Sequence, residues 1–132
     1  MKKKLFLISL IGLICATSAY AACNGGTEIT NTVGTTFCKS NVALNWWSAA
    51  AWCKANKLQL ATMYEMCPSW DGNEGDNKCP ELKGKAKYRA WSATALGTSN
   101  AFSVDLTNGS VYNYADRTAN YLSGEALYAF CR

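Results

Sequence analysis

The chain has 132 residues and a formal net charge of +4 at pH 7, and it contains no histidine. Much of the basic excess lies in Lys2, Lys3 and Lys4, without which the net charge is +1. This balance gives no indication of nucleic acid or acidic lipid as a partner, and the lack of histidine excludes catalysis by an imidazole base.

Residues 1–21 have the organisation of a secretory signal peptide. Three lysines precede a short apolar run, which ends at Ala19-Tyr20-Ala21 in the A-x-A cleavage pattern. The run is too short for a spanning helix, and no longer one follows. We predict cleavage after Ala21, one mature domain over residues 22–132, and export to the periplasm, the cell surface or the medium.

Six cysteines remain once this leader is removed, and an even number in a small exported domain indicates three disulfides. A metal site is the alternative, but no C-x-x-C spacing and no histidine support it. Lipidation of Cys23 is a further alternative, because Tyr20-Ala21-Ala22 before it loosely resembles a lipoprotein processing site. It would leave one of the other cysteines unpaired, so we favour simple cleavage. The six are Cys23, Cys38, Cys53, Cys67, Cys79 and Cys131.

The start of the mature chain predicts a hairpin followed by a helix. Residues 23–38 place β-branched side chains around Asn31 and Gly34, with a cysteine at each end, which favours a hairpin closed by a Cys23–Cys38 disulfide. Asn45 is a suitable N-cap for a helix over 46–56, where aromatic and small residues recur at helical spacing.

The next segment predicts a short strand and a second helix. Leu58 and Leu60 flank a polar residue, as in a strand. Thr62 and Glu65 have the spacing of a capping box, which would open a helix carrying Cys67. A long polar loop over 68–87 follows, and the chain is completed by a strand in AWSAT, a hairpin in FSVDLTNGSVYNY and a last strand in ALYAFCR.

The dipeptide Asn108-Gly109 predicts a two-residue type I′ turn within the closing hairpin. That turn would pair Asp105 with Tyr112 and Ser103 with Tyr114 on a polar face. Phe102, Val104 and Leu106 alternate with these residues and would face the core.

In this order, the motifs resemble those of a C-type lectin-like domain, over about residues 37–132. The closing segment also resembles bacterial exported domains of the wider form of that fold. The matching motifs are Trp46-x-x-Ala49-x-x-x-Cys53, Leu60-Ala61-Thr62 with Glu65, Trp91-Ser92 and Tyr128-Ala129-Phe130-Cys131.

The resemblance implies an α+β fold in which two helices pack on small antiparallel sheets beside a long loop. It also implies the pairing of the cysteines: Cys53–Cys131 would tie the first helix to the last strand, Cys67–Cys79 would lie in or beside the loop, and Cys23–Cys38 at the base.

The calcium ligands of sugar-binding members are missing. Neither a Glu-Pro-Asn or Gln-Pro-Asp triplet nor a Trp-Asn-Asp triplet occurs. The acidic run Asp71-Gly72-Asn73-Glu74-Gly75-Asp76 also fails the EF-hand template, because its sixth position is not glycine. We therefore expect a solvated acidic loop, no metal and no cofactor.

Aromatic residues provide the candidates for core and for ligand contact. Trp46 is expected in the core, Trp47 at its boundary and Trp52 in the core or at its edge. Tyrosine and tryptophan on a polar face are typical of recognition surfaces. The candidate ligand-binding residues are Trp70, Asp105, Tyr112 and Tyr114.

These features favour an exported, disulfide-bonded binding module that recognises a protein or a glycan without calcium. The alternative is a structural or assembly subunit of a bacterial surface appendage. A third hypothesis, an enzyme on the formylglycine-generating branch of the fold, needs a reactive cysteine pair. Catalysis has little support, since neither a G-x-S-x-G motif nor an expected free thiol is present.

Overall fold

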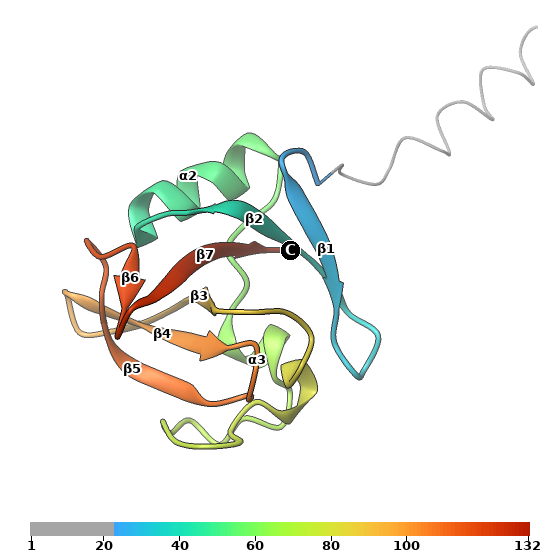
Figure 1. The fold of residues 1–132 in the computed structure, drawn as a ribbon, viewed down its shortest axis with the longest axis vertical. Coiled ribbons are helices and arrows are strands. Elements are labelled where there is room, and N and C mark those ends of the chain that lie inside the picture. Colours follow the sequence, from blue (N-terminus) through green and yellow to red (C-terminus); the bar gives the residue numbers. More distant parts are fainter. Residues whose placement is uncertain (1–22) are drawn as a thin grey trace, which may run out of the picture.

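A computed structural model describes residues 23–132, so the predicted signal peptide and the predicted cleavage after Ala21 lie outside the described residues. The described chain forms one mixed sheet with two α-helices and a 3₁₀ turn (Figure 1). The strands are β1 (Gly26–Thr30), β2 (Thr36–Ala43), β3 (Arg89–Leu96), β4 (Asn100–Asp105), β5 (Val111–Asp116), β6 (Tyr121–Leu122) and β7 (Glu125–Cys131). The helical elements are α2 (Trp46–Ala55), α3 (Met63–Met66) and η2 (Pro80–Leu82).

The sheet has seven strands in the order β1-β2-β7-β3-β4-β5, with β6 paired to β7. All pairs are antiparallel except β3 with β7. The prediction of a mixed helix-and-strand fold with two helices and three disulfides is confirmed. The expectation of separate small antiparallel sheets is wrong, because β7 hydrogen-bonds to β2 on one side and to β3 on the other.

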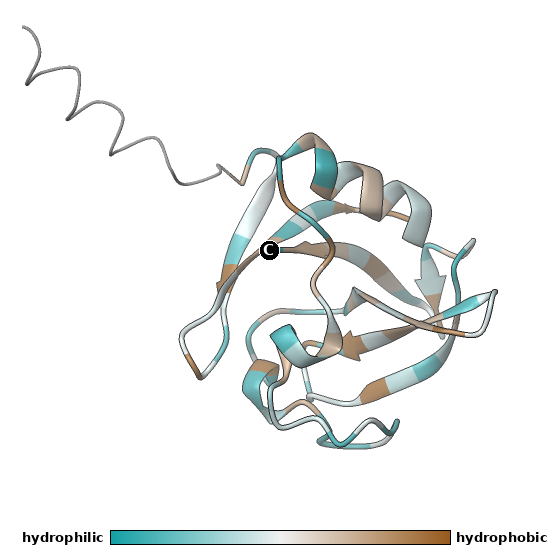
Figure 2. Cartoon of the chain, turned by 180° about the vertical axis from the view of Figure 1, so that it is seen from behind, coloured by the Kyte–Doolittle hydropathy of each residue, from teal (hydrophilic) through white to brown (hydrophobic). Residues whose placement is uncertain are grey.

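Each face of the sheet is buried by a different part of the chain. We call one the helix face, since α2 covers it, and the other the loop face, which is covered by α3 and part of residues 68–87. The helix face carries Trp91, Ala101, Leu127, Ala129 and Cys131. The loop face carries Ala90, Phe102, Val104, Val111 and Phe130. Coloured by hydropathy, the strands show apolar stretches, and the loop at the bottom of the view is mostly hydrophilic (Figure 2).

Helix α2 begins and ends close to its predicted limits. The side chain of Asn45 accepts a hydrogen bond from the backbone N–H of Ser48 at 2.8 Å, as expected of an N-cap. Ala49 and Cys53 are fully buried one turn apart, so the small side chains bring the helix close to β7.

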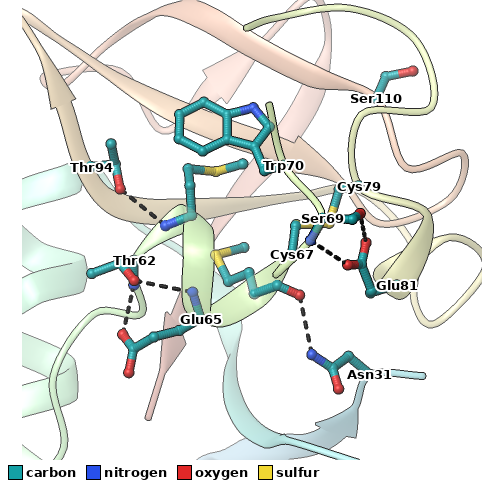
Figure 3. The surroundings of a disulfide bond; sticks show 12 residues. Asn31, Thr62, Glu65, Cys67, Ser69, Trp70, Cys79, Glu81, Thr94 and Ser110 are labelled. Atoms are coloured by element: carbon teal, nitrogen blue, oxygen red, sulfur yellow. Dashed lines mark hydrogen bonds between the residues drawn. A yellow bond between two sulfur atoms is a disulfide. The ribbon is translucent and has the colours of Figure 1, made fainter. Parts of the chain in front are cut away.

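Helix α3 is only four residues long, although its capping box is present. Thr62 accepts from the N–H of Glu65, whose carboxylate accepts from the N–H of Thr62 (Figure 3). Cys67 follows the helix rather than lying within it, because the residue before Pro68 is disfavoured in the α conformation.

Side-chain hydrogen bonds hold the loop residues around this short helix (Figure 3). Asn31, in the β1–β2 turn, donates to the carbonyl of Met66 at 3.1 Å. The buried carboxylate of Glu81 accepts from both the N–H and the hydroxyl of Ser69. These bonds satisfy polar groups that the loop brings into the interior.

The three disulfides are Cys23–Cys38, Cys53–Cys131 and Cys67–Cys79, as the resemblance implied. Cys53 lies in α2 and Cys131 at the end of β7, so this bond fixes the helix to the centre of the sheet.

The predicted register of the closing hairpin is wrong by two residues. Val104 pairs with Val111 and Ser103 with Tyr112, so residues 106–109 all lie in the connection between the strands. Tertiary contacts select this longer turn: the N–H of Leu106 donates to Tyr88, and the carbonyl of Gly109 accepts from Cys79. A shift by an even number keeps each side chain on its predicted face, so Tyr112 still lies beside Ser103.

Removing the long-range disulfide should destabilise the protein most. The Cys53→Ala/Cys131→Ala double variant removes a disulfide between residues 78 apart in the sequence, whereas Cys23–Cys38 joins residues 15 apart. In the chain-entropy model, loss of the Cys53–Cys131 disulfide lowers the free energy of unfolding by about 4.5 kcal/mol, and loss of Cys23–Cys38 lowers it by about 3 kcal/mol. Urea denaturation of the two double variants measures both losses, and a larger loss for Cys23→Ala/Cys38→Ala would contradict the assignment.

The two adjacent tryptophans of α2 should differ sharply in their effect on stability. Trp46 packs against the helix-face core and donates from its indole to the carbonyl of Ser92 at 2.9 Å, whereas Trp47 is 55% exposed. We expect Trp46→Ala to lower the free energy of unfolding by about 3 kcal/mol and Trp47→Ala by about 0.5 kcal/mol or less. Equal losses in denaturant titrations would show that α2 is rotated from this position.

Candidate binding surface

Two tyrosines of β5 form an aromatic pair at the surface. The ring centroids of Tyr112 and Tyr114 are 5.6 Å apart with an interplanar angle of 82°, an edge-to-face contact. Tyr114 is 49% exposed, and Tyr112 is half-buried. The pair therefore presents two ring surfaces in a fixed relation.

The guanidinium of Arg89 lies against this pair. Its central carbon is 4.0 Å from the ring centroid of Tyr112, and its Nε donates to Glu125 at 2.8 Å. Arg89 is in β3 and Tyr112 in β5, so the side chain reaches across β4. The sheet places all three residues on the helix face, because Arg89 alternates with Trp91, Tyr112 pairs with Ser103, and Glu125 precedes Leu127 by two.

Arg89 is charged although it is buried. Burial opposes its charge, but the hydrogen bond and charge of Glu125, with smaller contributions from Tyr112 and Asp105, raise the pKa of Arg89 above its ordinary value. The Arg89 side chain is 6% exposed, and that of Glu125 is 39% exposed. The ion pair thus extends from the interior to the surface beside the tyrosines.

Two polar atoms near this arrangement have no hydrogen-bond partner. In the described part of the chain, the buried side-chain atoms in this condition are Nη1 of Arg89 and Oγ of Ser103. Ser103 is directly opposite Tyr112 in the β4–β5 ladder and opposite Trp91 in the β3–β4 ladder. Buried polar groups are rarely left without a hydrogen-bond partner in native structures, so Arg89 and Ser103 are exceptions to this rule.

Asp105, a predicted ligand-binding residue, has a local structural role. It is 4% exposed, and its Oδ1 accepts from the backbone N–H of Thr107 at 2.9 Å, closing the turn after β4. It lies opposite Arg89 in the β3–β4 ladder and contributes negative charge there.

Trp70 lies apart from the tyrosine pair, on the loop face. It is 7% exposed, its indole donates to the carbonyl of Asn73, and its ring meets that of Phe102 at 4.9 Å. Phe102 and Ser103 point to opposite faces, so Trp70 and Tyr112 are separated by the sheet. The structure brings Tyr112 and Tyr114 together and places Asp105 opposite Arg89, whose guanidinium contacts Tyr112. Trp70 is not part of this group.

Arg89 was not among the residues predicted from the sequence. Its one local signal is its alternation with Trp91 in a strand that otherwise carries small residues. Nothing in that pattern indicates that its side chain crosses β4 to reach a tyrosine of β5.

Two carboxylates of the acidic loop, those of Asp71 and Asp76, form bonds within the protein. Asp71 forms an ion pair with Lys78 at 2.6 Å and accepts from the N–H of Asn73, and these bonds lower the pKa of Asp71. Asp76 accepts from the hydroxyl of Ser110 at 3.3 Å. Within residues 23–132 no group of three or more His, Cys, Asp or Glu side chains is placed to hold a metal ion.

A separate cleft of about 560 Å³ lies between the β1–β2 hairpin and the end of the chain. Phe37, Leu58 and the Cys23–Cys38 disulfide contribute its apolar wall, and Lys57 and Arg132 contribute charge. It does not include the tyrosine pair.

No family model and no curated protein matches this chain. None of the helices among residues 23–132 has both the length and the apolar character needed to cross a membrane.

Calcium should leave the stability of the protein unchanged. The carboxylate of Asp71 already has Lys78 as its partner, and no neighbouring carboxylates converge with it. Thermal melting in millimolar calcium and in excess chelator should give the same midpoint. A midpoint higher by several degrees in calcium would show that the loop has a coordination geometry not present here.

Proposed function

We propose that this protein is an exported, disulfide-bonded binding module of the C-type lectin-like type that recognises a protein or glycan ligand without calcium. The resemblance rests on an ordered set of motifs, the first and last of which lie in a helix and a strand as expected, whereas the strand expected at Leu58 and Leu60 is reduced to a single bridge from Leu60 to Cys131. The Trp46 to Cys53 motif lies in α2, and the closing motif lies in β7. Three disulfides in a small domain are typical of an oxidising compartment outside the cytosol.

The observation that carries the proposal is the tyrosine pair held by a buried arginine. Interface hot spots are enriched in tyrosine and arginine, since these side chains offer large contact areas with polar groups at their ends. Here Tyr112 is held between Arg89 and Tyr114, so part of the entropy of ordering its ring is lost before a ligand arrives. This arrangement supports binding.

The hypothesis of a formylglycine-generating enzyme has less support. It requires a reactive pair of cysteines, and all six cysteines among residues 23–132 are joined in disulfides. A structural subunit of a surface appendage has one observation in its favour, the exposed ring of Trp47 on α2. A lone exposed aromatic side chain is common on monomeric proteins, so the binding module remains the better proposal.

The proposal is tested with the mature domain, residues 22–132, on glycan and protein arrays with calcium and with chelator. We expect a saturable ligand whose signal is the same in both buffers. Light scattering of the same sample gives its oligomeric state. A protein that forms polymers and binds nothing on either array would favour the structural subunit instead.

Substitution of Tyr114 should weaken ligand binding while leaving the fold intact. Its ring is 49% exposed, so Tyr114→Ala should change the free energy of unfolding by about 0.5 kcal/mol or less. The loss of binding free energy should be about 1–2 kcal/mol if the residue is a hot spot.

Tyr64→Ala is the matched control, because Tyr64 is 57% exposed and lies on α3 at the loop face. Titration calorimetry with the array ligand should show an affinity close to that of the unmodified protein. If Tyr64→Ala weakens binding and Tyr114→Ala does not, the ligand binds at the loop face.

A further inference from the structure

Tyr88, Tyr121 and Tyr128 form a second group of aromatic side chains, which we call the tyrosine cluster. Tyr128 lies in β7, Tyr121 lies in β6, and Tyr88 directly precedes β3. The ring centroids of Tyr88 and Tyr128 are 6.1 Å apart. Tyr121 pairs with Ala126, two residues before Tyr128, so both tyrosines lie on the same side of the sheet. Burial raises the pKa of Tyr128, and the charges of Tyr88 and Tyr121 add to this shift, as expected of neighbouring phenols.

The cluster lies on the loop face, beyond the area that α3 and the loop cover. Tyr128 precedes Phe130 by two residues, and the ring of Phe130 belongs to the loop-face core. Tyr88 is 44% exposed, Tyr121 is 55% exposed and Tyr128 is half-buried. In Figure 1, β6 and the start of β7 lie at the left of the view, away from α3. The sheet thus separates the cluster from Tyr112 on the helix face.

Tyr88 has a backbone conformation that large side chains rarely adopt. Its φ is 69°, in the left-handed region, where glycine has no steric cost and an aromatic residue does. The side chain is too exposed for packing in the core to explain a tyrosine there. Strained residues of this kind are concentrated at functional sites. The strain therefore indicates a role for the Tyr88 ring at the surface.

Lys39 brings a positive charge to the cluster. Its Nζ lies 3.6 Å from the ring centroid of Tyr128, a cation–π contact, and donates to the carbonyl of Ser40 at 3.3 Å. Within residues 23–132, no ion pair includes Lys39 or the exposed Lys87, which precedes Tyr88. Burial lowers the pKa of Lys39, because a half-buried ammonium is poorly solvated. A carboxylate from another molecule would supply the missing counter-charge.

Exposed phenol rings beside such lysines fit a protein segment that carries both carboxylates and apolar side chains. Tyrosine offers a large apolar contact area with a hydroxyl at its end. Lysines without a counter-charge attract the carboxylates and orient the segment. Nucleic acid and other polyanions fit less well, since the net charge of the chain without Lys2, Lys3 and Lys4 is only +1.

We propose that the tyrosine cluster is a second binding surface, which takes an acidic peptide segment of a partner protein. Carboxylates of the segment pair with Lys39 and Lys87, and its apolar side chains lie on the rings of Tyr88 and Tyr128. The surface is on the opposite face of the sheet from the tyrosine pair, so both can be occupied at once. It does not depend on the proposed function.

Two substitutions of Tyr88 test the strain without any ligand. Tyr88→Ala removes the ring and keeps a side chain in the left-handed conformation, whereas Tyr88→Gly removes the ring and relieves the strain. Tyr88→Gly should therefore melt a few degrees higher than Tyr88→Ala. A lower melting temperature for Tyr88→Gly would show that the backbone at Tyr88 is not strained, and this would overturn the argument for its ring.

Phage-displayed random dodecapeptides, selected on the immobilised mature domain, test the binding. The enriched peptides should be acidic, and the synthetic peptides should bind more weakly in high salt than in low salt when measured by fluorescence polarisation. Tyr88→Gly should weaken their binding about tenfold, the effect of losing a hot-spot side chain. Lys39→Gln should also weaken it and should reduce the dependence on salt.

Tyr114→Ala is the matched control, because Tyr114 is similarly exposed but belongs to the tyrosine pair. It should bind the selected peptides as the unmodified protein does. The proposal is overturned if no peptide is enriched, if the enriched peptides are neutral or basic, or if Tyr88→Gly binds them unchanged. It is also overturned if single-stranded oligothymidylate displaces the peptides and binds more tightly, since the surface then recognises a polyanion.

The two variants also separate this proposal from the proposed function. Loss of the array ligand in Tyr114→Ala tests the tyrosine pair, and loss of the acidic peptide in Tyr88→Gly tests the tyrosine cluster. Either result can fail while the other stands.

Discussion

The structure depends on the position of β7, the last strand of the chain. Its edges pair with β2 on one side and β3 on the other, so it joins the amino-terminal hairpin to the β3–β4–β5 meander. Cys131 at its end is bonded to Cys53 in α2. Without β7 the two parts of the sheet would have exposed edges, and α2 would lose the strand against which it mainly packs.

Because both faces of this sheet are apolar, the chain must cover both. Helix α2 covers one with small buried side chains such as Ala49. On the other face the cover is irregular, and irregular chain brings polar backbone groups inside. This explains the hydrogen bonds of Glu81 and Asn31 and the Cys67–Cys79 disulfide, which hold the segment where regular secondary structure does not. The polar composition of this segment is therefore partly structural.

The candidate surface lies where polar residues continue along the helix face of the sheet. There Arg89, Ser103 and Tyr112 take the place of apolar side chains, and Glu125 balances the charge. An ion pair whose arginine is buried is a weak source of stability, and two unpaired polar atoms beside it reduce stability further. Apolar residues of similar size would stabilise the fold better, and this cost supports the recognition role proposed for the surface.

The sequence by itself determined the local features of this protein. Asn45 defined the start of α2, Thr62 and Glu65 defined the capping box, and alternation assigned Tyr112 and Val104 to opposite faces. These features depend on residues a few positions apart, whose geometry the backbone fixes. The hairpin between Cys23 and Cys38 indicated their disulfide, whereas the Cys53–Cys131 pairing came from the resemblance. Only the tertiary structure decided the rest: the pairing of β7 with β3, the longer turn at Gly109, the burial of Trp70 and the reach of Arg89 to Tyr112. Each of these depends on segments distant in sequence, and no local periodicity records which distant segment becomes the neighbour.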